Sequence, residues 1–239
     1  MPQLIHGDCL EVLPTLPDAS IDCILADLPY GITKAKWDCE IPLDKLWEQY
    51  LRIAKENCPI VLFSSQPFTS RLISSNLEIY KYCWYWEKER GTGFLNAKKQ
   101  PLRCIEEICV FYKKAKYNPQ MVKLDKPYKH KLPVFASENY NPVATCENNQ
   151  TIYKEFTHSY PKNILKYSRK IKGNSHSTQK PLDLMKYLVL TYTNENDLIL
   201  DNTMGSGTTC LAAKLLKRDY IGIEKDKKFF DIAVERLKT

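Results

Sequence analysis

Two groups of chemically active residues follow apolar runs in this sequence. The first group comes directly after the apolar run at 21–26 and consists of Asp27-Leu28-Pro29-Tyr30. This group places a carboxylate, a rigid turn and an aromatic ring at the end of a buried strand. The carboxylate could bind an exocyclic amino group, and the aromatic ring could stack on the ring that carries it. Turn chemistry alone also explains Asp and Pro at such a position. The tetrapeptide by itself therefore leaves a structural turn and an active site both open.

The second group follows the apolar run at 198–200 and consists of Asp201-Asn202-Thr203-Met204-Gly205-Ser206-Gly207-Thr208-Thr209. Its two glycines would let the backbone turn tightly and approach a ligand closely. Glu224 ends the next apolar run, 23 residues after Asp201. An acid about 20 residues downstream is where a dinucleotide-type βαβ unit holds ribose hydroxyls. The pattern indicates an adenosine cofactor without identifying it, and an ordinary tight turn is the alternative.

Strands and helices in alternation must position both groups. The spacing of apolar residues predicts strands at 3–6, 21–26, 59–63, 80–86, 107–112, 198–200 and 220–223. It predicts helices at 9–13, 42–58, 68–75, 182–193, 208–216 and 228–237. Such alternation is typical of an α/β, doubly wound, mostly parallel sheet. We expect the two groups to lie at the carboxyl ends of neighbouring central strands.

The segment 113–175 differs from the rest of the chain in charge and pattern. It holds 13 Lys and Arg against 4 Asp and Glu, a net +9, so that the remainder carries −2 of the total of +7. Six tyrosines are interleaved with these basic residues, and helical or strand periodicity disappears. We expect a long irregular insertion that meets a polyanionic partner. A solvated charged surface is the alternative.

Composition and length exclude several classes of protein. With 239 residues, the chain has the length of one domain with an insertion. Nine cysteines contain no paired Cys-x-x-Cys motif, so we expect no metal site. No apolar run is long enough for a membrane span, and the N-terminus lacks a signal-peptide core, so we expect a cytoplasmic protein without a membrane partner.

Together these segments resemble the permuted, β-type DNA amino-methyltransferases of bacteria and phages. The first group resembles the Asp-Pro-Pro-Tyr catalytic motif of that family, and the second resembles its Asp-Pro-Phe-x-Gly-Ser-Gly-Thr-Thr motif. The segments His6-Gly7-Asp8-Cys9 and His176-Ser177-Thr178-Gln179-Lys180-Pro181 resemble its opening Gly-Asp segment and its His-Pro-Thr-Gln-Lys-Pro motif. The chain departs from the family at Leu28, at Asn202-Thr203 and at Ser177, where the family has Pro, Pro-Phe and Pro.

The resemblance implies a circularly permuted, Rossmann-like S-adenosylmethionine-dependent methyltransferase fold. Residues 1–112 would be the catalytic half, 113–175 the target-recognition insertion and 176–239 the cofactor-binding half. Asp27, Leu28, Pro29 and Tyr30 would be catalytic. The cofactor-binding residues would be Asp8 at the adenine, Glu224 at the ribose, Thr178 and Lys180 at the methionine carboxylate, and Asp201, Thr203, Gly205, Ser206, Gly207, Thr208 and Thr209 around the methionine. Asp8 could instead be a helix cap, and Lys180 a surface charge before a helix.

The implied reaction is methyl transfer from S-adenosylmethionine to N6 of adenine in DNA. The Asp27 carboxylate and the Leu28 carbonyl would hold the two hydrogens of the amino group, and Tyr30 would stack on a base that has left the duplex. No metal is required. Trp37 and Phe94 could line the base pocket, with core or hairpin packing as the alternative.

Three other functions remain open at this point: methylation of N4 of cytosine, methylation of RNA, and DNA binding by an inactive relative. The family also includes homodimers, and its members occur in restriction-modification systems and as solitary phage or chromosomal enzymes.

Overall fold

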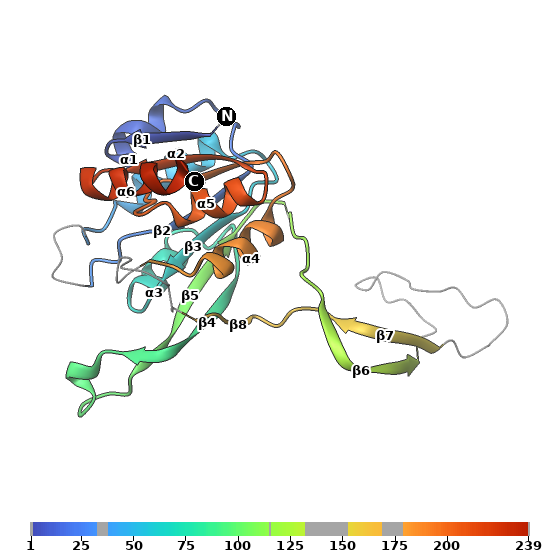
Figure 1. Ribbon diagram of the computed structural model, residues 1–239. Helices are drawn as coiled ribbons and strands as arrows, with labels where there is room; N and C mark the ends of the chain where they lie inside the picture. Colours follow the sequence, from blue (N-terminus) through green and yellow to red (C-terminus); the bar gives the residue numbers. More distant parts are fainter. Residues whose placement is uncertain (1, 33–37, 115, 132–152, 169–178, 239) are drawn as a thin grey trace. The chain divides into compact units, whose positions relative to one another are not determined.

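The computed structural model describes residues 2–32, 38–114, 116–131, 153–168 and 179–238 (Figure 1). The chain forms two compact units, one made of residues 1–118 and 163–239 and the other of residues 119–162. The larger unit contains all the described residues of the two sequence groups above, so its sheet determines how they are arranged.

An eight-stranded sheet forms the centre of the larger unit (Figure 1). Its strands, in spatial order, are β1 (Gln3–His6), β10 (Asp219–Glu224), β9 (Leu198–Asp201), β2 (Cys23–Asp27), β3 (Ile60–Ser64), β5 (Arg103–Phe111), β4 (Tyr80–Thr92) and β8 (Ile164–Lys166). The first five strands are parallel, β5 is antiparallel to both of its neighbours, and β8 is parallel to β4. The predicted α/β, mostly parallel sheet is confirmed.

Helices cover both faces of this sheet because the strands are apolar on both sides. Along β2, Ile24 and Ala26 face one core and Cys23 and Leu25 face the other. The first core packs against α1 (Cys9–Val12), the 3₁₀ turn η1 (Leu13–Thr15), α2 (Leu43–Ile53) and α3 (Phe68–Ser74). The second packs against α4 (Leu182–Tyr192), α5 (Thr208–Leu215) and α6 (Lys227–Lys238). Strands buried on both faces explain the unbroken apolar runs in the sequence.

Two strands extend beyond their predicted ends. The predicted strand 80–86 continues to Thr92, and the predicted strand 107–112 already begins at Arg103. Beyond Glu87, the last residue of β4 that pairs with β8, the two strands pair only with each other and form an arm, with the short 3₁₀ turn η2 (Phe94–Asn96) at its tip. Apart from the buried Lys88, their outer residues are mostly polar and mostly exposed, so no apolar pattern marks them in the sequence.

The described part of the smaller unit contains regular strands where we predicted irregular chain. Within 119–162, β6 (Val122–Lys131) and β7 (Tyr153–Ser159) form a two-stranded antiparallel sheet, in which the rings of Tyr128 and Phe156 stack with centroids 5.4 Å apart. The prediction of an irregular segment is therefore wrong for these residues. Both strands are largely exposed, so they lack the one-sided apolar alternation that would have revealed them. That the predicted insertion 113–175 recognises the target remains a prediction.

Candidate active site

Four neighbouring parallel strands carry acidic residues at their carboxyl ends. Glu224 ends β10, Asp201 ends β9, Asp27 ends β2, and Asp8 follows β1 by two residues. All four line one cavity of about 970 Å³. Ligands of open α/β sheets bind outside the carboxyl ends of the strands, and a cavity of this size is at the upper end for such sites.

Asp27 is held from three directions. Its Oδ1 accepts a hydrogen bond from the Tyr30 hydroxyl at 2.8 Å, and its Oδ2 accepts one from the Lys180 ammonium at 2.6 Å. Its backbone carbonyl accepts a hydrogen bond from Thr203 Oγ1 at 3.0 Å. The last contact joins the end of β2 to the turn after β9, so the two groups seen in the sequence lie side by side.

The remaining residues of the tetrapeptide have separate structural roles. The Leu28 side chain is buried in the core at 3% exposure, so only its backbone is available to a ligand. The Tyr30 ring stacks on Phe68 with centroids 5.5 Å apart, and the Lys180 ammonium lies over the same ring, 5.9 Å from its centroid. Burial, with the nearby Asp27 charge, raises the pKa of Tyr30 well above its ordinary value, so its hydroxyl stays a donor to Asp27.

The turn after the tetrapeptide is fixed by a carboxylate that sequence reasoning missed. Asp38 accepts hydrogen bonds from the backbone amides of Gly31 at 2.8 Å and Ile32 at 3.0 Å. Asp38 is buried and lines the cavity. Trp37 lies outside the described residues.

Lys180 lies between two carboxylates rather than on the surface. Besides Asp27 it pairs with Glu106 at 3.3 Å, and Glu106 accepts a hydrogen bond from Lys88 at 2.9 Å. Burial alone would lower the pKa of Lys180, but Asp27 and Glu106 outweigh burial and raise it. Burial likewise opposes charge on Glu106, but Lys180 and Lys88 lower its pKa below the ordinary value. Lys180 and Glu106 are therefore both ionised. The Lys180 side chain is only 11% exposed, so the surface-charge alternative for it is wrong.

The glycine turn is shaped by contacts with β10 and α6. The amide of Gly205 donates to Glu224 Oε2 at 2.9 Å, and the amide of Asp226 donates to Glu224 Oε1 at 2.8 Å. A Cβ added at Gly205 would meet no atom within 4 Å, so the backbone here borders open space. Gly207, at φ +73°, lies close against Ala233 of α6. The turn thus offers an exposed backbone and a fixed carboxylate to a ligand.

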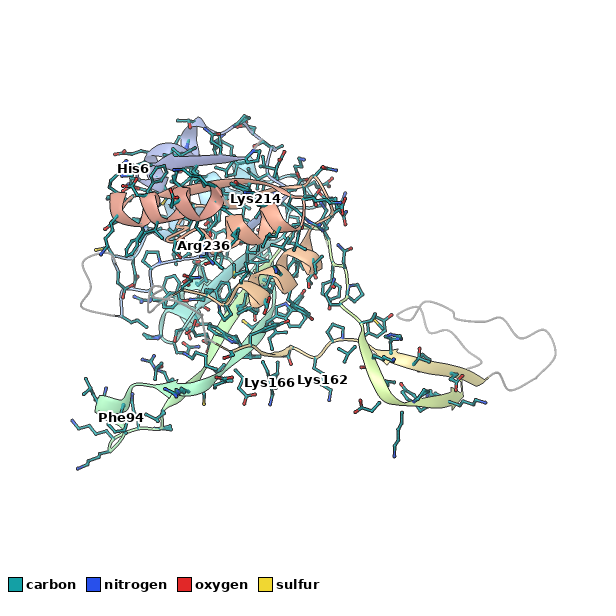
Figure 2. All side chains as sticks on the ribbon, in the orientation of Figure 1. His6, Phe94, Lys162, Lys166, Lys214 and Arg236 are labelled. Carbon is teal, nitrogen blue, oxygen red and sulfur yellow. The ribbon has the colours of Figure 1, made fainter. Side chains whose placement is uncertain are left out.

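Arg236 supports this turn from α6, although it belongs to no sequence motif. Its Nη1 donates to the Ser206 carbonyl at 3.2 Å and to Thr208 Oγ1 at 3.0 Å (labelled in Figure 2). An Arg in the last turn of a helix is ordinarily explained by the helix dipole alone. Only the packing of α6 against α5 reveals the additional role.

Asp201 is a buried carboxyl with few partners. It is 3% exposed and accepts a hydrogen bond from the Thr203 amide at 3.2 Å. Burial raises its pKa from 3.8 to about 7, although hydrogen bonds from Thr209 and Thr203 act in the opposite direction. Burial also raises the pKa of Glu224. A cationic or hydroxyl-bearing ligand in the cavity would stabilise the ionised form of both carboxyls.

Asp8 is the N-cap of α1, as the structural alternative predicted. Its Oδ1 accepts a hydrogen bond from the Leu10 amide at 2.9 Å, and its Oδ2 pairs with Lys225 at 2.7 Å. The hydrogen bond from Lys225 lowers the pKa of Asp8, so the group is ionised. Asp8 also lines the cavity, and its contact with a cofactor adenine remains a prediction.

The donor and acceptor set fits S-adenosylmethionine. Acids at Asp201 and Glu224, an open backbone at Gly205 and the cavity shared with Asp27 match a ligand that carries ribose hydroxyls and positive charge. Ser206, Thr208 and the remaining turn residues line the same cavity, except Gly207. Thr178 lies outside the described residues. Within these residues no cluster of three His, Cys, Asp or Glu could hold a metal, and no helix could span a membrane.

Comparison with known proteins identifies relatives along nearly the whole chain. The model of a family described as DNA methylase, N6_N4_Mtase, matches residues 21–235. The Type II methyltransferase M.HinfI of Haemophilus influenzae is 30% identical over 98% of this chain and 68% of that protein. The DNA adenine methyltransferase YhdJ of Escherichia coli (strain K12) is 26% identical over 98% of this chain and 82% of that protein.

A solved structure agrees with these sequence matches. The crystal structure of an M1.HpyAVI–SAM complex superposes with a TM-score of 0.63 at 27% identity, and the match covers 99% of this chain and 100% of the other.

Proposed function

Because the chain belongs to the DNA methylase family, we propose that it transfers a methyl group to N6 of adenine in DNA. S-adenosylmethionine is the cofactor of the reaction. The observation that carries the proposal is the position of Asp27, whose carbonyl lies 3.0 Å from Thr203 Oγ1 of the turn that follows Asp201. The base-holding carboxylate and the cofactor turn thereby share one cavity.

The proposed chemistry begins with an amino group that is a poor nucleophile. Its lone pair is delocalised into the adenine ring, and two acceptors that hold its hydrogens favour a tetrahedral nitrogen. Asp27 supplies one acceptor through its carboxylate, and Leu28 supplies the other through its carbonyl. Tyr30, supported from behind by Phe68, stacks on the base after it leaves the duplex. Stacking of this kind contributes about 1–3 kcal/mol per base.

The methyl transfer itself needs no group of the protein as nucleophile. Bound S-adenosylmethionine supplies a methyl group on a positively charged sulfur. The N6–carbon bond forms as the carbon–sulfur bond breaks, and the electron pair of that bond goes to sulfur. The nitrogen then loses one proton, which Asp27 is placed to accept. Before the base arrives, the Lys180 ammonium donates to Asp27 Oδ2 at 2.6 Å.

Lys180 must also give way to the substrate. It occupies Asp27 Oδ2 in this structure, which is one of the two carboxylate oxygens available to the amino group. Glu106, already 3.3 Å away, offers the ammonium a second partner. We propose that the amino group takes the place of Lys180 at Asp27. The methionine-carboxylate role implied for Lys180 by the resemblance remains a prediction.

Adenine is favoured over cytosine by the first residue of the motif. An Asp at position 27 accompanies N6-adenine specificity more often in this family than N4-cytosine specificity. The relative YhdJ, named as a DNA adenine methyltransferase, supports the same choice.

The test is methylation of unmodified duplex DNA by the purified chain, followed by digestion and mass spectrometry of the nucleosides. We expect N6-methyladenine, and we expect Asp27→Asn to lower the rate about 100-fold or more. Asp44→Asn, at an exposed position of α2, is the matched control and should keep the full rate.

Each other outcome contradicts a defined part of the proposal. N4-methylcytosine would contradict the choice of base, and methylation of RNA alone would contradict the choice of substrate. Full activity of Asp27→Asn would show that the catalytic assignment is wrong. Cofactor binding without methyl transfer to any nucleic acid would identify an inactive relative.

A further inference from the structure

The β4–β5 arm exposes two large apolar side chains at its tip. Figure 1 shows the arm extending away from the sheet, and Figure 2 shows Phe94 at its end. Phe94 is 79% exposed and Leu95 is 99% exposed. Two adjacent apolar side chains at this exposure are unfavourable in water and indicate a binding partner. Phe94 is not buried and does not line the cavity, so both core packing and a place in the base pocket are excluded for this residue.

The tip is a folded turn. The amide of Asn96 donates to the Gly93 carbonyl at 2.9 Å, and the amide of Ala97 donates to the Phe94 carbonyl at 3.0 Å. The amide of Lys99 donates to the Asn96 carbonyl at 2.8 Å. Gly93 at φ +90° makes the entry into this turn. The two apolar side chains are therefore presented on a defined backbone, so less ordering entropy opposes their binding.

The charges around the tip indicate that its partner is a polyanion. Residues 89–105 contain one acid, Glu89, and four bases, a net +3, and all of these side chains are exposed: Arg90, Lys98, Lys99 and Arg103. A second apolar protein surface would not require this excess of positive charge. DNA fits it, because its phosphates bind basic side chains.

The root of the arm is joined to the catalytic residues. Lys88 of β4 pairs with Glu106 of β5 at 2.9 Å, Glu106 pairs with Lys180 at 3.3 Å, and Lys180 pairs with Asp27 at 2.6 Å. Thr92, Gly93 and Arg103 of the arm also line the cavity that contains Asp27. The exposed pair thus begins one residue beyond the wall of the site that receives the target base.

We infer that Phe94 and Leu95 are a wedge that enters duplex DNA where the target base has left the stack. The inference rests on the proposed function and extends it to a surface that the catalytic motifs do not include. Extruding a base leaves an unstacked gap, and proteins that deform DNA fill such gaps with apolar side chains. The basic residues at the tip hold the neighbouring phosphates.

The test compares two substrates that differ only in the pairing of the target base. Sequencing of modified bases in DNA from expressing cells first identifies the methylated site. Duplexes with that site are then made with the target base either paired normally or opposite an abasic position, where extrusion costs less. Phe94→Ala and Leu95→Ala should lower kcat/KM on the paired duplex about 10- to 100-fold. On the abasic duplex the loss should be less than about threefold.

Four controls separate the wedge from other roles of the tip. Leu77→Ala, at a residue that is 65% exposed and does not line the cavity, should behave as the unaltered chain on both substrates. Lys98→Ala should weaken both substrates equally and in a salt-dependent way. Binding of S-adenosylmethionine, measured by calorimetry, should be unchanged in every variant. Phe94→Trp, which keeps a large ring, should restore the rate on the paired duplex.

Several results would overturn the inference. The inference is wrong if Phe94→Ala and Leu95→Ala keep full activity on the paired duplex. It is also wrong if kcat/KM falls equally on both duplexes. A concentration-dependent dimer that disappears in these variants would assign the tip to a second copy of the chain instead. Absence of methylation by the unaltered chain would refute the proposed function, and the inference with it.

Discussion

Replacing Asp201 by Asn should stabilise the free protein at alkaline pH and weaken its cofactor binding. The carboxyl is 3% exposed, and burial raises its pKa from 3.8 to about 7. Between these two values the folded protein holds a proton that the unfolded chain has lost. Stability therefore falls as pH rises through this window, and above about 7 the full cost of a buried charge is present.

The size of the effect follows from the two pKa values. Each unit of difference corresponds to about 1.4 kcal/mol, which gives roughly 4 kcal/mol for complete ionisation. Part of that cost is already present at pH 5, so the change between pH 5 and pH 8 is about 2–3 kcal/mol. Asn keeps an oxygen to accept from the Thr203 amide, and it does not titrate. The unfolding free energy of Asp201→Asn should therefore rise relative to the unaltered chain by this amount over the same interval.

Urea unfolding at a series of pH values between 5 and 8 measures this difference directly. Comparison of the two proteins at each pH cancels the contribution of Glu224, whose pKa burial also raises. Asp44→Asn, at an exposed position, should follow the unaltered chain across the series. If the curves of Asp201→Asn and the unaltered chain run parallel from pH 5 to pH 8, burial does not hold the proton on Asp201 and the reasoning is refuted.

Cofactor binding provides the second half of the same prediction. S-adenosylmethionine carries a positively charged sulfur that its demethylated product lacks. An ionised Asp201 should therefore bind S-adenosylmethionine more tightly than the product. The affinity of the unaltered chain for S-adenosylmethionine should increase as pH rises through about 7. In Asp201→Asn this increase should be absent, and the loss of affinity should be larger for S-adenosylmethionine than for the product. Isothermal titration of both ligands tests this difference.

Three further variants test the contacts around the site. Gly207→Ala should lower the unfolding free energy by more than Gly205→Ala. Both glycines lie at positive φ, where a side chain costs about 1–2 kcal/mol, but only the Cβ added at 207 would meet another atom, Ala233 Cβ, at 3.0 Å. Equal shifts in melting temperature would contradict this prediction. Lys180→Met leaves two carboxylates without their shared ammonium and should lower the unfolding free energy by about 3 kcal/mol. Urea unfolding should show that adding Glu106→Gln partly restores this stability. If Lys180→Met alone leaves the unfolding free energy unchanged, the network contributes nothing to stability. Tyr30→Phe removes only the hydrogen bond from the hydroxyl to Asp27, and it should cost about 1 kcal/mol of stability and slow turnover. Tyr30→Ala also removes the ring, so it should in addition raise KM for DNA. An equal KM in both variants would exclude stacking by the ring.

The sequence predicts the sheet well because its strands are buried on both faces. The run that ends at Asp27 and the run that ends at Asp201 are too apolar for surface strands, and helical spacing follows each of them. Strands of this kind belong at the centre of a parallel sheet, and β2 does pair with β9. The meeting of the two motifs could therefore be predicted from local pattern and general topology, although Asp27 and Asp201 are 174 positions apart.

The contacts of Lys180 and Arg236 could not be predicted in this way. Lys180 precedes α4, and its approach to Asp27 depends on how Leu184 and Met185 anchor that helix in the core. Arg236 reaches the glycine turn only because α6 packs on α5. Both are tertiary consequences of packing, and local periodicity contains no signal for either. The β6–β7 hairpin was missed for the opposite reason, since it has little core to produce a pattern.

The distribution of charge supports the proposal that the target base enters the site without its neighbouring phosphates. Eight Asp and Glu but only four Lys and Arg occur among the described residues that line the cavity. This excess of acids attracts a cationic cofactor and repels the phosphates of DNA, so the backbone of the duplex stays outside. An uncharged base is the one part of the substrate that can enter without this repulsion, and it must leave the stack to do so. We therefore expect the basic residues that bind phosphate to lie outside the cavity, as Arg90, Lys98 and Lys99 of the β4–β5 arm do.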